Sequence, residues 1–218
     1  MSKMTLAAAA VAAGALTYAE VALPTQTLIS DYALVSGGLL PVLLGMLALA
    51  GACLSLSYGL TTREPGRSAA SRVLLMAAAA GLIMSAAFPT DPDGVSTMAG
   101  EIHRWSAALV FTSLPVAGWA LARGRSVRPR WNAVRSLSVV SALTLAVYLA
   151  AHPASVTSSL IGGSAYYGLM ERGVVLAEIV LVAVMAVATA REHRAARVAI
   201  PATVTEPAQA PERERLAA

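Results

Sequence analysis

Acidic and histidine side chains gather at the ends of apolar blocks, where they could carry out acid–base chemistry. Asp91 lies in a connection that Pro89 and Pro92 hold rigid, and His103 opens the next apolar block. A carboxylate beside an imidazole is the minimum for general acid–base catalysis, because the carboxylate orients the ring and raises its basicity. We therefore predict Asp91 and His103 as catalytic residues, with Glu171 as a third.

The same residue types could also bind a divalent metal ion. Asp91 and His103 supply one oxygen and one nitrogen ligand. A second nitrogen or further carboxylate oxygens could come from Glu101, His152 or Glu171. The sequence contains no HExxH motif, no GxSxG elbow and no phosphate-binding loop. The choice between acid–base and metal-assisted chemistry therefore stays open, and no cofactor is assigned.

Four further polar residues are candidates for binding a substrate. Glu178 lies two turns inside the last apolar block, and an ionisable group at that depth is costly unless it is paired or lines a cavity that contains water. Arg104 and Arg172 are the cations expected on the same side of the membrane as Glu178. An ion pair between Glu178 and one of them is therefore the alternative to a functional role. The candidate substrate-binding residues are Asp31, His152, Arg172 and Glu178.

Composition indicates which elements must position these side chains. Of the 218 residues, 57% are hydrophobic and only 13% are charged, whereas globular proteins have roughly 25% charged residues. Stretches of about 20 apolar residues are long enough to cross a bilayer as helices. We predict an all-α integral membrane protein, a bundle of six transmembrane helices. The predicted helices span about 4–23, 34–60, 73–88, 105–122, 136–152 and 172–190, within a membrane domain of residues 1–190.

The distribution of basic residues predicts the orientation of the chain. Fourteen of the 16 Lys and Arg residues fall at one end of the predicted helices, and only Arg104 and Arg172 fall at the other. By the positive-inside rule both termini are cytoplasmic, so the candidate site faces outward. The segment 191–218 is expected to be a basic and then disordered cytoplasmic tail. Basic residues in short connections do not indicate nucleic-acid binding, and the expected surroundings are the lipid bilayer of the cell membrane.

Four short motifs resemble those of a known family. They are Ile29-Ser30-Asp31-Tyr32, Phe88-Pro89-Thr90-Asp91-Pro92, Gly100-Glu101-Ile102-His103 and Gly168-Leu169-Met170-Glu171-Arg172. Together they are similar to the prokaryotic membrane proteins grouped as domain of unknown function 998, over nearly the whole chain up to about Ala190. The resemblance supports the membrane fold and implies no established activity. The residues that match the family's polar motif are Asp31, Asp91, His103, Glu171 and Arg172.

The candidate residues and the membrane setting predict a function by class. The first hypothesis is an intramembrane enzyme that performs acid–base or metal-assisted chemistry on a lipid-like or isoprenoid substrate entering from the bilayer. A small-molecule or ion transporter or binding protein is the alternative, and an accessory membrane subunit is a third possibility. Neither the reaction nor the oligomeric state is predicted. We expect Asp91, His103 and Glu171 to approach each other at the outer membrane surface, and a structure that holds them far apart would contradict the site made of these three residues.

Overall fold

A computed structural model describes residues 2–92 and 94–198, and all regular structure within them is helical. Six of the helices are long and apolar enough to cross a membrane. The predicted fold class, an all-α six-helix membrane bundle, is therefore confirmed. The spanning helices are α1 (Ser2–Ala22), α2 (Leu39–Arg63), α3 (Ala69–Ala87), α4 (Met98–Ala122), α5 (Pro129–Ala151) and α7 (Tyr167–Val198). The short helical turns η1 (Ser30–Leu34), α6 (Ser158–Ile161) and η2 (Gly163–Ala165) lie in the connections.

Most of the helices begin earlier than hydropathy predicts, because polar turns continue them beyond the apolar blocks. α4 begins at Met98 instead of Trp105. Its N-cap is Thr97, whose hydroxyl accepts a backbone hydrogen bond at 3.2 Å. α5 has Pro129 in its first turn, a position that needs no backbone N–H. α2 is the exception and begins at Leu39, because η1 ends at Leu34 and a turn at 35–38 follows it.

α7 is longer than predicted at both ends. It begins at Tyr167 instead of Arg172 and continues to Val198, so the first residues of the predicted tail are helical. The part of α7 that is apolar enough to cross a membrane ends at Glu192. The remainder of the predicted tail, 199–218, lies outside the described residues.

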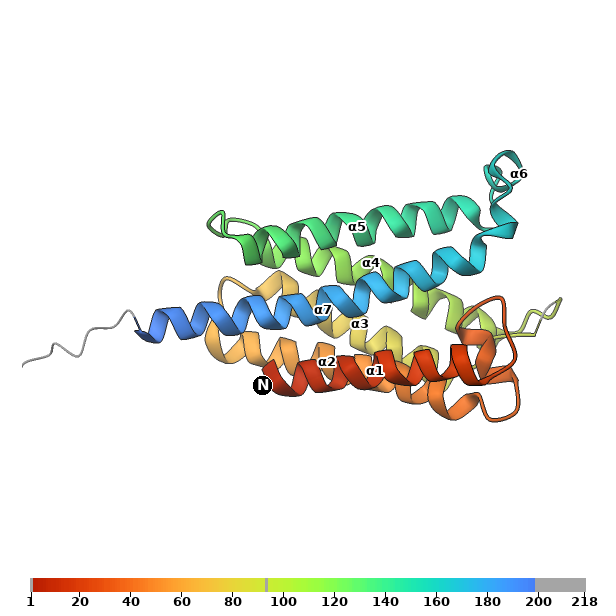
Figure 1. Ribbon diagram of the computed structural model, residues 1–218, viewed down its shortest axis with the longest axis horizontal. Coiled ribbons are helices and arrows are strands. Elements are labelled where there is room, and N and C mark those ends of the chain that lie inside the picture. The colour runs from red at the N-terminus through yellow and green to blue at the C-terminus, as the bar shows by residue number, and fades with distance from the viewer. Residues whose placement is uncertain (1, 93, 199–218) are drawn as a thin grey trace, which may run out of the picture.

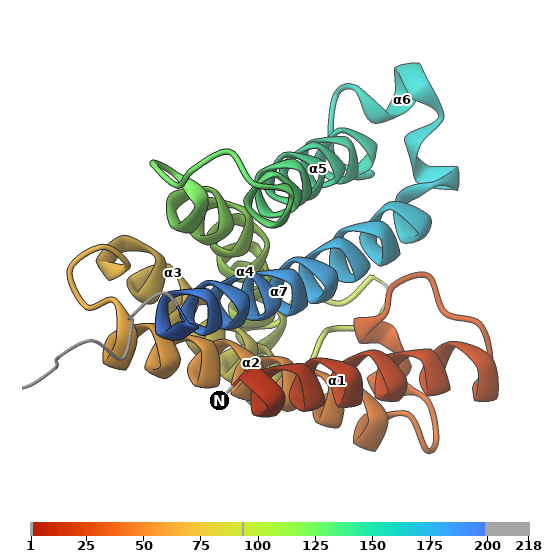
Figure 2. The same cartoon turned by 60° about the vertical axis from the view of Figure 1, so that its left-hand side comes forward.

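Consecutive helices pack side by side, and α7 closes the bundle by packing against α5, α1 and α4. Figure 1 shows α7 between α5 and α1, and Figure 2 shows the same order after a turn of 60°. The connections 23–38, 88–97 and 152–166 meet at one end of the bundle, which we call the acidic end (right in Figure 1). The connections 64–68 and 123–128 and the last turns of α7 form the opposite end, the arginine end.

A buried cation ties three elements together at the arginine end. The side chain of Arg125 is 3% exposed and forms ion pairs with Glu64, which follows α2, and with Glu192 of α7 at 2.9 Å. Its guanidinium also lies 4.4 Å from the centre of the Trp131 ring, which gives a cation–π contact. The sequence assigns Arg125 only to membrane orientation. The structure shows that it also joins the ends of α2, α5 and α7.

The half of the bundle next to the arginine end is filled with apolar side chains. Leu60, Leu75, Leu121 and Met185 come from four different helices, and each is at most 2% exposed. Protein interiors of closely packed side chains contain few voids larger than a water molecule. The tight core therefore occupies the half of the membrane domain that lies away from the predicted site residues.

Candidate functional site

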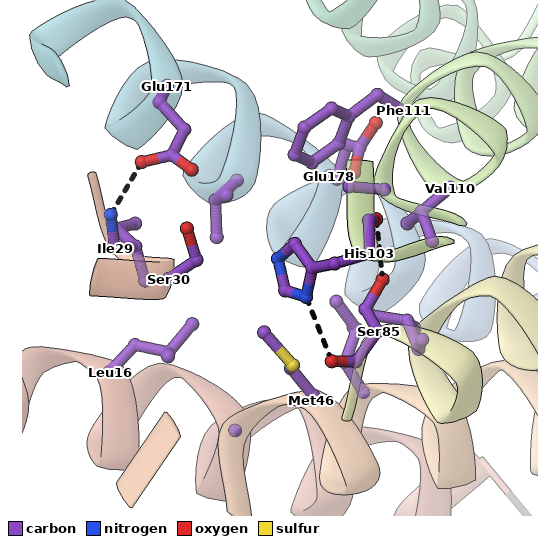
Figure 3. A pocket seen from close by; sticks show the side chains of 15 residues that line it. Leu16, Ile29, Ser30, Met46, Ser85, His103, Val110, Phe111, Glu171 and Glu178 are labelled. Atoms are coloured by element: carbon purple, nitrogen blue, oxygen red, sulfur yellow. Dashed lines mark hydrogen bonds between the residues drawn. The ribbon is translucent and has the colours of Figure 1, made fainter. Parts of the chain in front are cut away.

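A mostly apolar cavity of about 70 Å³ lies inside the bundle towards the acidic end (Figure 3). Residues of α1, α2, α3, α4 and α7 line it, and Ile29 and Ser30 line it from the connection between α1 and α2. The polar lining residues are Ser30, Ser85, His103, Glu171 and Glu178. Small molecules bind preferentially in concave apolar sites that contain a few placed polar groups. This cavity is therefore the candidate site.

Two backbone carbonyls fix the orientation of His103. α3 ends at Ala87, and the last carbonyls of a helix have no partner within that helix. Nδ1 of His103 lies 3.0 Å from the carbonyl oxygen of Ser85 and 2.9 Å from that of Phe88. Because carbonyls only accept hydrogen bonds, Nδ1 carries a proton, and the neutral ring has its lone pair on Nε2.

The second ring nitrogen of His103, Nε2, faces the cavity. Figure 3 shows the ring with one nitrogen bonded to Ser85 and the other directed towards the space bounded by Ser30 and Glu171. His103 is only 6% exposed, and no hydrogen bond to Nε2 is found within residues 2–92 and 94–198. A buried nitrogen with a free lone pair can accept a proton or a hydrogen bond from a bound molecule.

Glu178 is a buried carboxyl of α7 that borders the same cavity. It is 1% exposed, and its Oε1 has no hydrogen-bond partner in the part of the chain that the structure describes. The two cations that the sequence offers as partners are engaged elsewhere. Arg172 pairs with Glu20 at 2.7 Å, and Arg104 pairs with Glu101 at 2.5 Å. A carboxyl without a cationic partner at this depth of a spanning helix is typical of a functional site.

Glu171 borders the cavity and binds the connection that precedes η1. Its Oε2 accepts a hydrogen bond from the backbone N–H of Ile29 at 2.6 Å, as the dashed line in Figure 3 shows. The residue is 6% exposed. The structure therefore places His103 of α4 around the same cavity as Glu171 and Glu178 of α7, although α4 and α7 are far apart in the sequence.

Arg172 anchors the connection after α1 to the beginning of α7. Its Nε pairs with Glu20 near the end of α1. Its other two nitrogens donate to the backbone carbonyls of Gln26, Thr27 and Gly168 at 2.8 to 2.9 Å. Arg172 does not line the cavity, and its contacts hold the connection that carries Ile29 in place.

Asp91 lies at the acidic end, outside the lining of the cavity. Its carboxylate accepts hydrogen bonds from the Thr97 hydroxyl at 2.6 Å and from the Thr97 backbone N–H at 2.9 Å. These bonds hold the pKa of the Asp91 carboxyl below its usual range. The expected contact between Asp91 and His103 is not formed in the described structure, because Nδ1 of His103 binds the α3 carbonyls. The observed contacts of Asp91 instead fix the beginning of α4.

We expect Asp91→Asn to lower the melting temperature of the protein at pH 7, because a neutral amide binds Thr97 more weakly than a carboxylate does. The lowered pKa means that this contribution is present above about pH 4, the usual range of a free aspartate, and is lost as the pH falls through the folded value. Thermal melts of both proteins at pH 7 and pH 3 measure the difference. Glu101→Gln, at a half-exposed carboxyl, is the control. An equal difference at both pH values would contradict the assignment.

Asp31 and His152 also lie at the acidic end and do not line the cavity. Asp31 accepts a hydrogen bond from the backbone N–H of Leu28 at 3.0 Å. His152 follows α5, where its ring meets that of Tyr167 edge to face at 5.1 Å and its Nδ1 accepts the N–H of Ala154 at 3.1 Å. The substrate-binding roles of Asp31 and His152 stay predictions.

Several groups that shape the site carry little signal in the sequence. Ser85 is a small residue in an Ala-rich helix, which is typical of helix packing in membranes. Phe111 lines the cavity but is one more apolar residue of its block. The carbonyls that hold His103 have no signal, since every residue has one. No cluster of three or more His, Cys, Asp or Glu side chains that could hold a metal ion occurs among the residues described.

The fold and the cavity define a multi-pass helical membrane protein whose polar groups converge inside one half of the bundle. Residues 4–188 match the family described as protein of unknown function (DUF998), and the chain belongs to this family. The resemblance seen in the sequence motifs is thereby confirmed. No curated protein and no solved structure matches the chain. The function must therefore be inferred from the site.

Proposed function

We propose that this protein is an intramembrane enzyme that transfers protons on a lipid-like or isoprenoid substrate in the cavity bordered by His103. The observation that supports this proposal best is the arrangement of the buried ring. Two α3 carbonyls hold a proton on Nδ1, and Nε2 faces the cavity. Nε2 is then a base directed at whatever molecule the cavity holds, and general bases must lie within hydrogen-bond reach of the proton that they remove.

The two carboxyls of the cavity have different roles in this proposal. Glu171 is fixed by its hydrogen bond to Ile29 and returns a proton to the substrate. Glu178 has an unpaired oxygen within the described structure and binds the substrate. One proton moves from the substrate to Nε2 of His103, and one moves from protonated Glu171 to another substrate atom. The proton on Nε2 then passes to Glu171, which restores both groups. The reaction is therefore balanced without an oxidant, a reductant or a second substrate.

The position of the cavity favours a site that is closed towards the arginine end over a transport pathway. All of its lining residues lie in the half of the bundle next to the acidic end. The other half contains buried Leu60, Leu121 and Met185, and a second hollow beside Ser2 is only about 10 Å³. A hollow of that size holds about one water molecule. A continuous passage would require these core side chains to move apart.

The distribution of charge supports an outward-facing site in the cell membrane. In the sequence, fourteen of the 16 basic residues fall near the two termini or near the connections 64–68 and 123–128, which the positive-inside rule places in the cytoplasm. The acidic end would then meet the outer leaflet. A substrate that partitions into lipid would enter from that leaflet.

His103→Asn tests the proposed base. The asparagine amide N–H can replace Nδ1 as the donor to the Ser85 and Phe88 carbonyls, but the side chain has no group equivalent to the Nε2 lone pair. Loss of a general base slows a reaction by about 10²- to 10⁴-fold. We expect a lipid or metabolite that changes when the wild type is expressed to return to the level of cells without the protein. Untargeted lipid and metabolite profiling measures the change.

The matched control is Glu101→Gln, which alters a carboxyl on α4 two residues from His103 that does not line the cavity. It should leave the profile of the wild type intact. Size-exclusion chromatography of fluorescent fusions verifies that the wild type, His103→Asn and Glu101→Gln are present in the membrane at equal levels. A wild-type profile from cells that express folded His103→Asn would overturn the proposal, as would no difference between cells with and without the wild type.

A further inference from the structure

We infer that the part of the ligand held in the cavity is a protonated amine on a short apolar substituent. This inference rests on the proposed function in so far as it takes the same cavity as the substrate site. It goes further by naming the chemical group that the cavity recognises. Three properties of the cavity around His103, Glu171 and Glu178 favour an amine: its hydrogen-bonding groups, its charge and its size.

The first argument is that two atoms of the cavity, Nε2 of His103 and Oε1 of Glu178, can accept hydrogen bonds and have no donor among the described residues. In its neutral form the ring of His103 presents its lone pair on Nε2, because Nδ1 donates to the carbonyls of Ser85 and Phe88. Oε1 of Glu178 has no donor within the part of the chain that is described. The Ser85 hydroxyl is directed towards the carbonyl oxygen of His103 at 3.4 Å. A ligand must therefore bring its own donors, and an ammonium group has three.

The second argument is charge. Two carboxyls line the cavity, and no lysine or arginine is among the lining residues that the structure describes. Two arginines directly follow lining residues in the sequence. Arg172 donates to three carbonyls and pairs with Glu20, and Arg104 pairs with Glu101. A carboxylate or phosphate in this cavity would be a buried anion without a counter-charge, which is strongly unfavourable. An ammonium group can instead form an ion pair with the Glu178 carboxyl, and the ring of Phe111 on the cavity lining favours a cation as well.

The third argument is size. The cavity of about 70 Å³ is roughly half the volume of a protein cavity of about 150 Å³ that binds benzene. It therefore has room for an amino group and a few carbon atoms. The apolar part of such a ligand would contact Leu16, Met46 and Val175, which line the cavity beside the polar groups. A larger substrate would place only its amino end here.

Ethylamine is the probe that tests the inference. The full chain is reconstituted in phosphatidylcholine nanodiscs and titrated at pH 7.5 with ethylammonium chloride, ethanol or sodium acetate, with sodium chloride added to equal ionic strength. Thermal denaturation is followed by tryptophan fluorescence. We expect a saturable rise in melting temperature with ethylamine and none with ethanol or acetate. A ligand that binds only the folded state raises the melting temperature in this way.

Glu178→Gln keeps the shape of the side chain and removes its charge, and it should weaken ethylamine binding at least tenfold. Glu101→Gln, which removes a carboxyl outside the cavity, should bind ethylamine as the wild type does. Ethylamine binding that is equal in Glu178→Gln overturns the inference, as does equal protection by ethanol or any protection by acetate. A titration repeated in nanodiscs that contain phosphatidylethanolamine separates the two sources of an amine. If phosphatidylethanolamine competes with ethylamine, the natural ligand is the amine of a lipid. If the midpoint of the ethylamine titration is unchanged, the ligand is a free amine.

The failure of this inference and the failure of the proposed function give different results. A product that disappears in His103→Asn, together with no ethylamine binding, keeps the enzyme and rejects the amine. Ethylamine binding that depends on Glu178, together with no change in cell lipids or metabolites, keeps the amine site and rejects the enzyme.

Discussion

Replacement of Arg125 by alanine is expected to lower the free energy of unfolding of the bundle by about 3 to 5 kcal/mol, the usual cost of removing one partner of a buried ion pair. Arg125 is 3% exposed, pairs with Glu64 and Glu192, and lies over the ring of Trp131. Its removal leaves two carboxylates close together without their cation. The ends of α2 and α7 then repel each other at the arginine end.

The control for Arg125→Ala is Arg123→Ala. This residue lies in the same connection and is exposed, so the two variants have the same net charge and differ in the buried contacts. Exposed charges contribute little, and we expect a change within about 0.5 kcal/mol for Arg123→Ala. Unfolding by dodecyl sulfate titration in mixed micelles measures both. Equal stability of the two variants would show that the Arg125 network does not hold the helices together.

Replacement of Glu178 by methionine is expected to raise the free energy of unfolding, in contrast to Arg125→Ala. The expected gain is about 1 to 3 kcal/mol, the cost of leaving a buried polar group unsatisfied. Glu178 is 1% exposed, and its Oε1 has no partner within residues 2–92 and 94–198. Methionine fills a similar volume without a polar group. The same change should abolish ethylamine binding and the activity, because residues retained for function often reduce stability.

Glu171→Met provides the matched comparison on the same helix. Glu171 is similarly buried, but its Oε2 accepts the N–H of Ile29 at 2.6 Å. Its replacement leaves that N–H without a partner, so the protein should become less stable. The same dodecyl sulfate titration measures both variants. A Glu178→Met protein that is less stable than the wild type would mean that the carboxyl has a structural partner and is not reserved for a ligand.

The six spans, their order and the position of most charged residues were predictable from the sequence. The apolar blocks contain enough consecutive apolar residues to cross a bilayer, so each block predicts a helix without knowledge of the others. The bounds were less accurate. Hydropathy places the beginning of α4 at Trp105, whereas the helix begins seven residues earlier, at Met98, where Thr97 caps it. Capping depends on hydrogen bonds and not on hydropathy.

The candidate site was predictable in part. His103 and Glu171 were singled out by residue type and by their place at the ends of the blocks, and the structure brings both to one cavity. Glu178 was singled out by its depth in the last block. Asp91 was expected beside His103, but the nearest acceptors to Nδ1 are backbone carbonyls of α3. Residue types alone do not distinguish a carboxylate from a carbonyl as the partner of an imidazole.

By itself, the sequence determined that this protein is a six-span helical membrane protein with acidic and basic residues at opposite ends. Each of these properties is a sum over consecutive residues, because transfer of a segment into lipid depends on its own composition and length. Only the tertiary structure decided that Arg172 binds Glu20, that Arg125 is buried, and that Nε2 of His103 shares a cavity with Glu178. Such contacts join residues of different helices, and helix packing decides which of the available donors and acceptors meet.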